Sequence, residues 1–264
     1  MDILERIVKV QQADLQRKKQ SFPEYYWEAA PLFNRPAKSL KAALAESETG
    51  IIAEFKRRSP SKPSINFQAK VNEVASGYEN AGVSGMSVLT NGPFFGGSLE
   101  DLIQARASCN LPIIRKEFII DPYQITVAKA HGADVILLIA ACLEPSRLQM
   151  LAKKTKSLGM DVLLEVHNEA ELQANIIPEV DLIGVNNRNL KTFEVDVNTS
   201  LELLKQIPAD YLPVSESGLS DPATVQMLRD AGFKGFLMGE HFMRTEDPAQ
   251  SASAFIDQLK TPQQ

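Results

Sequence analysis

From residue 51 onward, short apolar runs alternate with segments that have the periodicity of helices. The runs are rich in β-branched residues, as in IIAEF (51–55) and VILLI (135–139). After the seventh run, Val225, Leu228 and Ala231 recur every three residues, as on the buried face of a helix. The runs begin near residues 51, 85, 112, 135, 161, 182, 213 and 235. Their mean spacing of about 26 residues is the length of one strand followed by one helix.

This alternation predicts eight strand–helix units, which in about 210 residues fit an α/β fold of the (β/α)8 TIM-barrel type. A doubly wound parallel sheet is the main alternative, but it usually carries a glycine-rich phosphate loop after its first strand. Here KRRSP (56–60) follows the first run, so we expect the barrel. Two helix starts are also predicted. Ser98 and Asp101 resemble a capping box, and Asp221 precedes Pro222 at a first helical position.

The first 48 residues stand outside this rhythm. Ile3, Leu4, Ile7, Val8 and Leu15 mark an amphipathic helix with a basic-rich polar face. A second short helix is predicted at residues 39–46, after a proline-rich stretch. A membrane-surface helix is the alternative for the first segment, but its apolar face is narrow and lacks aromatic residues. We therefore expect residues 1–48 to form a helical extension packed on a single barrel domain of residues 49–260.

Composition narrows the functional classes. The chain has 264 residues, and 28 Lys and Arg against 33 Asp and Glu give a net charge of −5. This mild acidity argues against a nucleic-acid or membrane-surface binding protein. Two cysteines and three histidines, without a paired motif, argue against a disulfide scaffold or a metal centre. The N-terminal segment lacks the apolar core of a signal peptide, and no apolar run approaches the ~20 residues that span a bilayer. We therefore expect a cytoplasmic protein.

Polar and charged residues gather where the predicted strands end. Side chains at positions i and i+2 of a strand point to the same face. The fifth strand ends in Glu165, and the seventh ends in Ser215 and Ser217. Three further pairs share a face at strand ends: Glu54 with Lys56, Lys116 with Phe118, and Asn186 with Arg188. If these faces point inward, charged groups from several strands converge at one mouth of the barrel.

Such a cluster has two interpretations, because burying an unpaired charge is costly. The groups either form ion pairs that close the barrel or serve a ligand. As a set they lie at C-terminal strand ends, where barrel active sites are built, which favours an active site.

The loops after the seventh and eighth strands, SGLSDP (217–222) and GEH (239–241), predict a phosphate site. Glycines there allow backbone N–H groups to approach an anion, and these two loops are the usual phosphate site of this fold. Two other features stay open. The segment FFGG (94–97) either packs against neighbouring helices or forms a wall for an apolar or aromatic ligand. His167 either carries protons or is a satisfied loop residue.

At these positions the chain resembles the indole-3-glycerol phosphate synthase family. The matching segments follow the order of the predicted strands, and an N-terminal helical extension is also a feature of that family. The segments are AEFKRRSPSK (53–62), FFGGSLEDL (94–102), RKEFII (115–120), LLEVHN (163–168), GVNNRNL (184–190), SESGLSDP (215–222) and GFLMGE (235–240).

The resemblance implies an activity that converts 1-(2-carboxyphenylamino)-1-deoxyribulose 5-phosphate into indole-3-glycerol phosphate, CO₂ and water. It implies Lys116 as general acid and Glu165 as general base, with Lys56 near the substrate carboxylate and Glu54 orienting the lysines. No cofactor is expected, because the iminium formed on ring closure can accept the electrons of decarboxylation. Asn186 and Ser217 complete the implied catalytic set by holding substrate hydroxyls or the developing intermediate. The implied binding residues are Ser59, Gly218, Gly239 and Glu240 for phosphate, and Phe95, Phe118, Leu137, Arg188 and Leu237 for the aromatic ring.

Two residues depart from the family pattern. Glu117 stands where the family usually has Asp, and by strand parity it faces away from Lys116, so we expect altered packing rather than lost activity. Pro63 replaces the usual glycine after SPSK, and it stiffens a loop that closes over substrate in this interpretation. That change bears on loop motion and product release more than on the chemistry.

Two further functions fit the same residues. A Schiff-base aldolase would use Lys116 or Lys56 as a neutral amine, but Glu54 next to Lys56 favours charged lysines. A non-catalytic phosphosugar-binding protein or assembly subunit would not need both the acid and the base that this chain retains. For the enzyme we expect a monomer whose partner is a small phosphorylated molecule, without nucleic acid or membrane.

Overall fold

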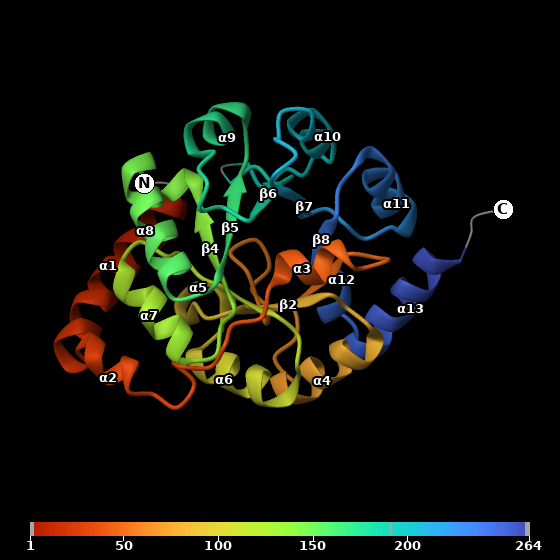
Figure 1. Cartoon of the computed structure of the whole chain (residues 1–264). Coiled ribbons are helices and arrows are strands. Elements are labelled where there is room, and N and C mark those ends of the chain that lie inside the picture. Colours follow the sequence, from red (N-terminus) through yellow and green to blue (C-terminus); the bar gives the residue numbers. More distant parts are fainter. Residues whose placement is uncertain (1–2, 191, 262–264) are drawn as a thin grey trace.

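The computed structural model describes residues 3–190 and 192–261 (Figure 1). Within them, eight parallel strands pair in chain order, and β8 pairs back onto β1 through Ile52 and Leu237. The sheet is therefore a closed barrel, and the doubly wound alternative is wrong. The strands are β1 (Ile51–Phe55), β2 (Gly85–Leu89), β3 (Ile113–Lys116), β4 (Val135–Ile139), β5 (Asp161–Val166), β6 (Leu182–Asn186), β7 (Leu212–Glu216) and β8 (Gly235–Met238).

Helices surround the barrel, and each strand is followed by at least one (Figure 1). Asp221 caps α11 by accepting from the Ala223 N–H, and Pro222 occupies the first turn as predicted. The capping box at α6 is only half formed. Ser98 accepts from the Asp101 N–H, but the Asp101 carboxylate is held by Arg57. The helices of the barrel are α4 (Val71–Ala81), α5 (Gly92–Phe95), α6 (Leu99–Ser108), α7 (Pro122–Ala130), α8 (Pro145–Ser157), α9 (Glu169–Asn175), α10 (Asn198–Leu204), α11 (Pro222–Ala231), α12 (Glu240–Met243) and α13 (Pro248–Lys260), and the 3-10 turn η1 (Ala140–Cys142) follows β4.

Inward-facing positions along the strands follow the period of two. Aliphatic residues of most strands fill the barrel interior, among them Ile52, Ile114 and Leu163, which are all fully buried. Two positions later on the same face come the charged residues Glu54, Lys116 and Glu165. The alternate side chains pack outward against the helices in a second, larger cluster. The alternation therefore delivers the charged residues to one end of the barrel.

The N-terminal segment contacts both ends of the barrel. It contains α1 (Ile3–Ser21), α2 (Glu24–Glu28) and α3 (Leu40–Ala45), of which α2 was not predicted. Leu40 and Leu44 of α3 join the interior cluster and cover the N-terminal strand ends (Figure 1). A Cβ on Gly85, the first residue of β2, would lie 2.5 Å from Leu40 Cδ1, so this close approach requires glycine. At the other end, the first turns of α1 reach the barrel mouth.

None of the helices described here is both long and apolar enough to cross a lipid bilayer.

Candidate active site

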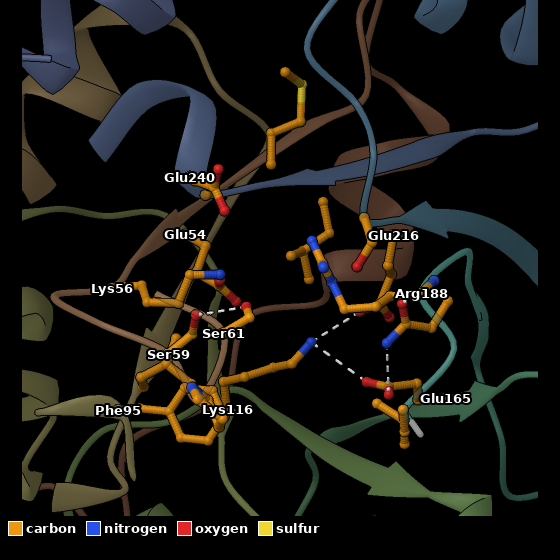
Figure 2. Close-up of a pocket in the computed structure, with 18 of the residues that line it drawn as sticks. Glu54, Lys56, Ser59, Ser61, Phe95, Lys116, Glu165, Arg188, Glu216 and Glu240 are labelled. Atoms are coloured by element: carbon orange, nitrogen blue, oxygen red, sulfur yellow. Dashed lines mark hydrogen bonds and ion pairs between the residues drawn. The ribbon is translucent and has the colours of Figure 1, made fainter. Parts of the chain in front are cut away.

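A cavity of about 330 Å³ opens at the C-terminal ends of the strands. Every catalytic and binding residue that the resemblance implies lines it, and Figure 2 shows several of them around the opening. They are Glu54, Lys56, Ser59, Phe95, Lys116, Phe118, Leu137, Glu165, Asn186, Arg188, Ser217, Gly218, Leu237, Gly239 and Glu240. The convergence expected from strand parity is therefore present, and it draws on residues nearly 190 positions apart in the chain.

Lys116 lies at the centre of the cavity between two carboxylates (Figure 2). Its Nζ is 2.8 Å from Glu216 Oε2 and 3.4 Å from Glu165 Oε2. Burial disfavours the lysine cation, but Glu216, Glu165 and Glu54 outweigh that effect and raise the pKa of Lys116 above its usual range. Lys116 is therefore a positively charged ammonium group at neutral pH.

The carboxylates around Lys116 differ in their charge. Burial favours the neutral acid in both, but Lys116 and His167 lower the pKa of Glu165, so this side chain is ionised. Burial, together with the nearby charge of Glu165, instead raises the pKa of Glu216 to about 7. The site thus holds one carboxylate that is firmly ionised and a second that titrates near neutral pH.

A second lysine–glutamate pair lies on β1 and the loop that follows it. Lys56 Nζ is 2.7 Å from Glu54 Oε1, and Ser87 Oγ donates to Glu54 Oε2 at 3.3 Å. Burial raises the pKa of Glu54, but Lys56 and Lys116 outweigh it and the net pKa is lowered. The Glu54 carboxylate is therefore ionised and holds Lys56 toward the cavity.

Glu216 is a site residue that the sequence reasoning missed. Strand 7 was expected to end in Ser215 and Ser217, with these polar groups facing the cavity. Ser215 instead is buried behind the strand, where it bonds to Ser200 at 2.8 Å and to Asn187 at 3.1 Å. The signal was available, because Val214 is an interior residue and Glu216 is two positions later on the same face. Ser217 still reaches the cavity because its φ of 68° breaks the strand alternation.

The phosphate end predicted from the loops is built mainly from backbone. Gly218 follows β7 with φ 77°, and Gly239 follows β8. A Cβ on Gly239 would lie 2.7 Å from Glu54 Oε1, so only glycine fits beside this carboxylate. The Glu240 carboxylate forms an ion pair with Lys62 from the loop after β1, which offsets its negative charge.

Apolar side chains form the opposite wall. The rings of Phe95 and Phe118 lie 6.1 Å apart at an interplanar angle of 35°, so Phe95 faces the cavity. Ile3, Leu4 and Ile7 of α1 complete this wall. A ligand with a flat apolar part can therefore lie along this side.

The carboxylate of Glu117, the residue that differs from the family pattern, does not pair with Lys116, as strand parity predicts. Its carboxylate accepts from Thr90 Oγ1 and from Asn91 Nδ2, both at 3.0 Å, rather than from Lys116. Glu117 is thus buried at the edge of the cavity, without an ion pair to Lys116, and it fixes the start of the loop after β2.

Among the described residues no group of three or more His, Cys, Asp or Glu side chains is arranged to hold a metal ion. The ionisable groups of the cavity instead alternate in sign, lysine against glutamate. This arrangement can give a proton at one position and take one at another.

Fold and cavity together define a (β/α)8-barrel protein with a lysine–glutamate acid–base site at its C-terminal strand ends. The family model for "Indole-3-glycerol phosphate synthase" matches residues 4–255. A protein of that name from Bacteroides thetaiotaomicron is 51% identical over 224 residues, covering 85% of this chain and 86% of the relative. Another from Acidovorax sp. (strain JS42) is 44% identical over 258 residues, covering 95% and 97%.

The chain therefore belongs to the indole-3-glycerol phosphate synthase family. It is an enzyme, a carboxy-lyase of tryptophan biosynthesis that acts on a small phosphorylated substrate. Among solved structures, KGPDC from Streptococcus mutans matches with a TM-score of 0.60 at 15% identity, covering 80% of this chain and 96% of that one. At that identity the likeness shows the barrel fold alone.

Proposed function

We propose that the enzyme converts 1-(2-carboxyphenylamino)-1-deoxyribulose 5-phosphate into indole-3-glycerol phosphate, CO₂ and water, with Lys116 as general acid and Glu165 as general base. The observation that supports this assignment is their geometry. The two groups lie 3.4 Å apart in one cavity, and their surroundings favour the ammonium and the carboxylate. An acid and a base of opposite charge can thus act on neighbouring atoms of one bound molecule.

In the first step the aromatic carbon that bears the carboxylate attacks the ketone carbon, which closes the five-membered ring. Lys116 Nζ gives its proton to the ketone oxygen, and the aniline nitrogen becomes an iminium. The bond to the carboxylate then breaks, CO₂ leaves, and the electron pair of that bond neutralises the iminium and restores the aromatic ring. Each positioned acid or base of this kind contributes about 10²–10⁴ in rate.

In the last step the new hydroxyl leaves as water and the ring carbon next to nitrogen loses a proton. The departing hydroxyl needs a second proton, for which Lys56 is the proposed donor. Glu165 takes the ring proton. The cycle delivers two protons and recovers one, so one proton enters from solvent per turnover.

The remaining residues bind and orient the substrate. Lys56 faces the substrate carboxylate and Glu54 holds that lysine, while Glu216 keeps Lys116 charged through its 2.8 Å contact. The proposed binding residues are Asn186 and Ser217 for hydroxyls, Ser59, Gly218, Gly239 and Glu240 for phosphate, mostly through backbone N–H groups, and Phe95, Phe118, Leu137, Arg188 and Leu237 for the aromatic ring.

The direct test is to incubate the purified enzyme with the substrate and follow indole fluorescence. Turnover is expected, and its absence in the wild type would overturn the proposal. Lys116→Met should abolish turnover while substrate still binds in calorimetry, because the apolar wall and the phosphate end remain. Lys153→Met removes an exposed lysine on α8 and should leave the rate unchanged. Normal turnover by Lys116→Met would remove Lys116 from the mechanism.

The Schiff-base alternative is disfavoured by the same geometry. A nucleophilic lysine must be neutral, whereas the carboxylates around Lys116 raise its pKa. Borohydride added during turnover should therefore trap no covalent adduct.

A further inference from the structure

His167 lies just beyond β5, with a carboxylate against each ring nitrogen. Its Nε2 is 3.3 Å from Glu165 Oε1, and its Nδ1 is 3.1 Å from Glu171 Oε2. The His167 backbone N–H also donates to Glu171 Oε2 at 2.8 Å, and Asn168 donates to the other Glu171 oxygen at 2.8 Å. Glu171 is thus fixed in the first turn of α9, and the imidazole lies between it and the proposed base.

This placement determines the charge of the ring. Ionised carboxylates only accept hydrogen bonds, and a neutral imidazole always has one nitrogen that is itself an acceptor. Nδ1 is within hydrogen-bonding distance of Glu171 Oε2, whereas Nε2 lies 3.3 Å from Glu165 Oε1 without an aligned hydrogen bond, so the two carboxylates favour the protonated ring through their proximity and charge. Burial disfavours the charged form of His167, but Glu165 and Glu171 outweigh it and raise its pKa to about 10. The sequence alone left open whether His167 carries protons or is a satisfied loop residue. The geometry points to a third role, that of a fixed cation.

We propose that His167, held by Glu171, is the positioning residue of the general base, and that it keeps Glu165 ionised and oriented through the catalytic cycle. This inference rests on the proposed function, in which Glu165 acts as base.

The contacts of Glu165 divide its two oxygens between different tasks. Oε1 faces His167 and accepts from Asn186 Nδ2 at 3.0 Å, so it is anchored. Oε2 faces Lys116 at 3.4 Å, on the side of the cavity where substrate lies. The anchored oxygen fixes the plane of the carboxylate, and Oε2 is the oxygen left to take the proton.

The cation matters most after the first step. Lys116 and His167 are the cationic side chains that the described structure places within 4 Å of the Glu165 carboxylate. Once Lys116 has given its proton to the ketone, it no longer favours the ionised form of Glu165. His167 then supplies the positive charge beside Glu165, so the carboxylate is still an anion when dehydration needs a base.

The charge of the ring can be measured without any turnover. In ¹⁵N-histidine-labelled enzyme at pH 8, we expect one imidazolium signal and two neutral rings. Burial lowers the pKa of both His131 and His241, so these rings are the neutral ones. His167→Gln should remove the imidazolium signal. A spectrum with three neutral rings at pH 8 would overturn the inference even if the enzyme is fully active.

Kinetics test the role itself. His167→Gln should lower kcat about 10- to 100-fold with KM changed less than about twofold, since a positioned base is worth about 10²–10⁴ and only its support is lost. The acid limb of the kcat–pH profile should move to higher pH, because Glu165 loses its cation. Glu171→Gln keeps the ring in place, and it should shift the same limb in the same direction by less. This second variant decides the question if His167→Gln does not fold.

Glu169→Gln is the matched control, because it removes an exposed carboxylate from the same turn of α9. It should leave kcat and the pH profile unchanged. Wild-type kcat and an unmoved acid limb in both His167→Gln and Glu171→Gln would overturn the inference while the proposed function stands. An inactive wild type would instead overturn the proposed function, and the NMR result would still decide the charge of His167.

Discussion

At the scale of single residues, the protonation of each ionisable side chain in the site depends on which charged side chains it contacts. Three contacts link four ionisable groups, Glu216 to Lys116, Lys116 to Glu165 and Glu165 to His167, and each group affects the protonation of the one it contacts. Glu216 is the clearest example, because its pKa is raised to about 7 while it still holds the Lys116 ammonium at 2.8 Å. Removing the Glu216 carboxylate should therefore lower the pKa of Lys116.

Glu216→Gln removes a carboxylate that raises the pKa of Lys116. The lysine should then lose its proton at lower pH, so the alkaline limb of the kcat/KM profile moves down. Pre-steady-state and steady-state rates between pH 6 and 11 measure this shift. Glu202→Gln, an exposed carboxylate on α10, is the control and should not move the limb. An alkaline limb unchanged in Glu216→Gln would mean that the carboxylate does not set the charge of Lys116.

The histidines also predict how stability varies with pH. The folded-state pKa of His167 is raised to about 10 from an ordinary value of 6.5. The stability that its charge contributes is therefore complete below pH 6.5 and is lost as pH rises toward 10. Urea midpoints of the wild type and His167→Gln should differ most near pH 6 and converge by pH 10. Burial lowers the pKa of His241, so the stability that its neutral ring contributes is present above pH 6.5 and is lost as the pH falls. The difference in urea midpoint between the wild type and His241→Gln should therefore shrink as the pH drops below 6.5, which is the opposite trend.

At the scale of elements, the loops over the cavity are fastened to one another. Arg57, just after β1, forms a two-armed bridge to Asp101 of α6 at 2.6 and 2.8 Å and also donates to the Gly96 carbonyl at 3.1 Å. Arg58 donates to the carbonyls of Gly92 and Pro93. The loop after β1 is thereby tied to the segment that carries Phe95.

Arg57→Lys keeps the charge but loses the two-armed geometry, because an ammonium group cannot match a carboxylate in that way. We expect KM to rise several-fold, with a smaller change in kcat, since the acid and base are untouched. Steady-state kinetics check this, with Arg17→Lys on the exposed face of α1 as the control. Equal KM values in wild type and Arg57→Lys would show that the bridge does not shape the cavity.

At the scale of the whole molecule, several contacts tie the N-terminal segment to the barrel, and the buried carboxylate of Asp134 makes two of them. Asp134, just before β4, accepts from Arg35 at 2.6 Å, from the Lys38 backbone N–H at 2.8 Å and from Arg106 at 2.8 Å. We propose on these contacts that residues 1–48 are an extension of a single barrel domain of residues 49–260 rather than a unit that folds apart. The extension closes the barrel with α3 and contributes Ile3, Leu4 and Ile7 of α1 to the cavity.

Asp134→Asn leaves the buried guanidinium of Arg106 and the half-buried guanidinium of Arg35 without their anion, and breaking a buried ion pair in this way costs about 3–5 kcal/mol. Urea unfolding should show a single transition at markedly lower denaturant, because the extension and the barrel share the contact. Glu73→Gln breaks an exposed pair with Lys70 and should leave the urea midpoint nearly unchanged. Two separate transitions in Asp134→Asn would contradict the single-unit proposal.

The sequence by itself determined the order of the elements, the barrel and the residues at most strand ends. These follow from the local alternation of side chains, and a period of two identifies the catalytic face of β1, β3, β5 and β6 without any distant contact. It did not reveal α2, a helix of only five residues whose Trp27 packs against His131 of the barrel, and it placed Ser215 on the wrong side of β7. In SES (215–217) the two serines suggested the inward face of the strand. Val214 faces the barrel interior, so the residue that follows it on the same face is Glu216.

Only the tertiary structure decided which charges meet. Lys116 and Glu216 are 100 positions apart, and their contact depends on how the closed barrel aligns β3 with β7 across its interior. The charge of His167 likewise needs Glu165 from β5 and Glu171 from α9 on opposite sides of one ring. Protonation depends on burial and on neighbours within a few ångströms, and local sequence patterns contain neither quantity.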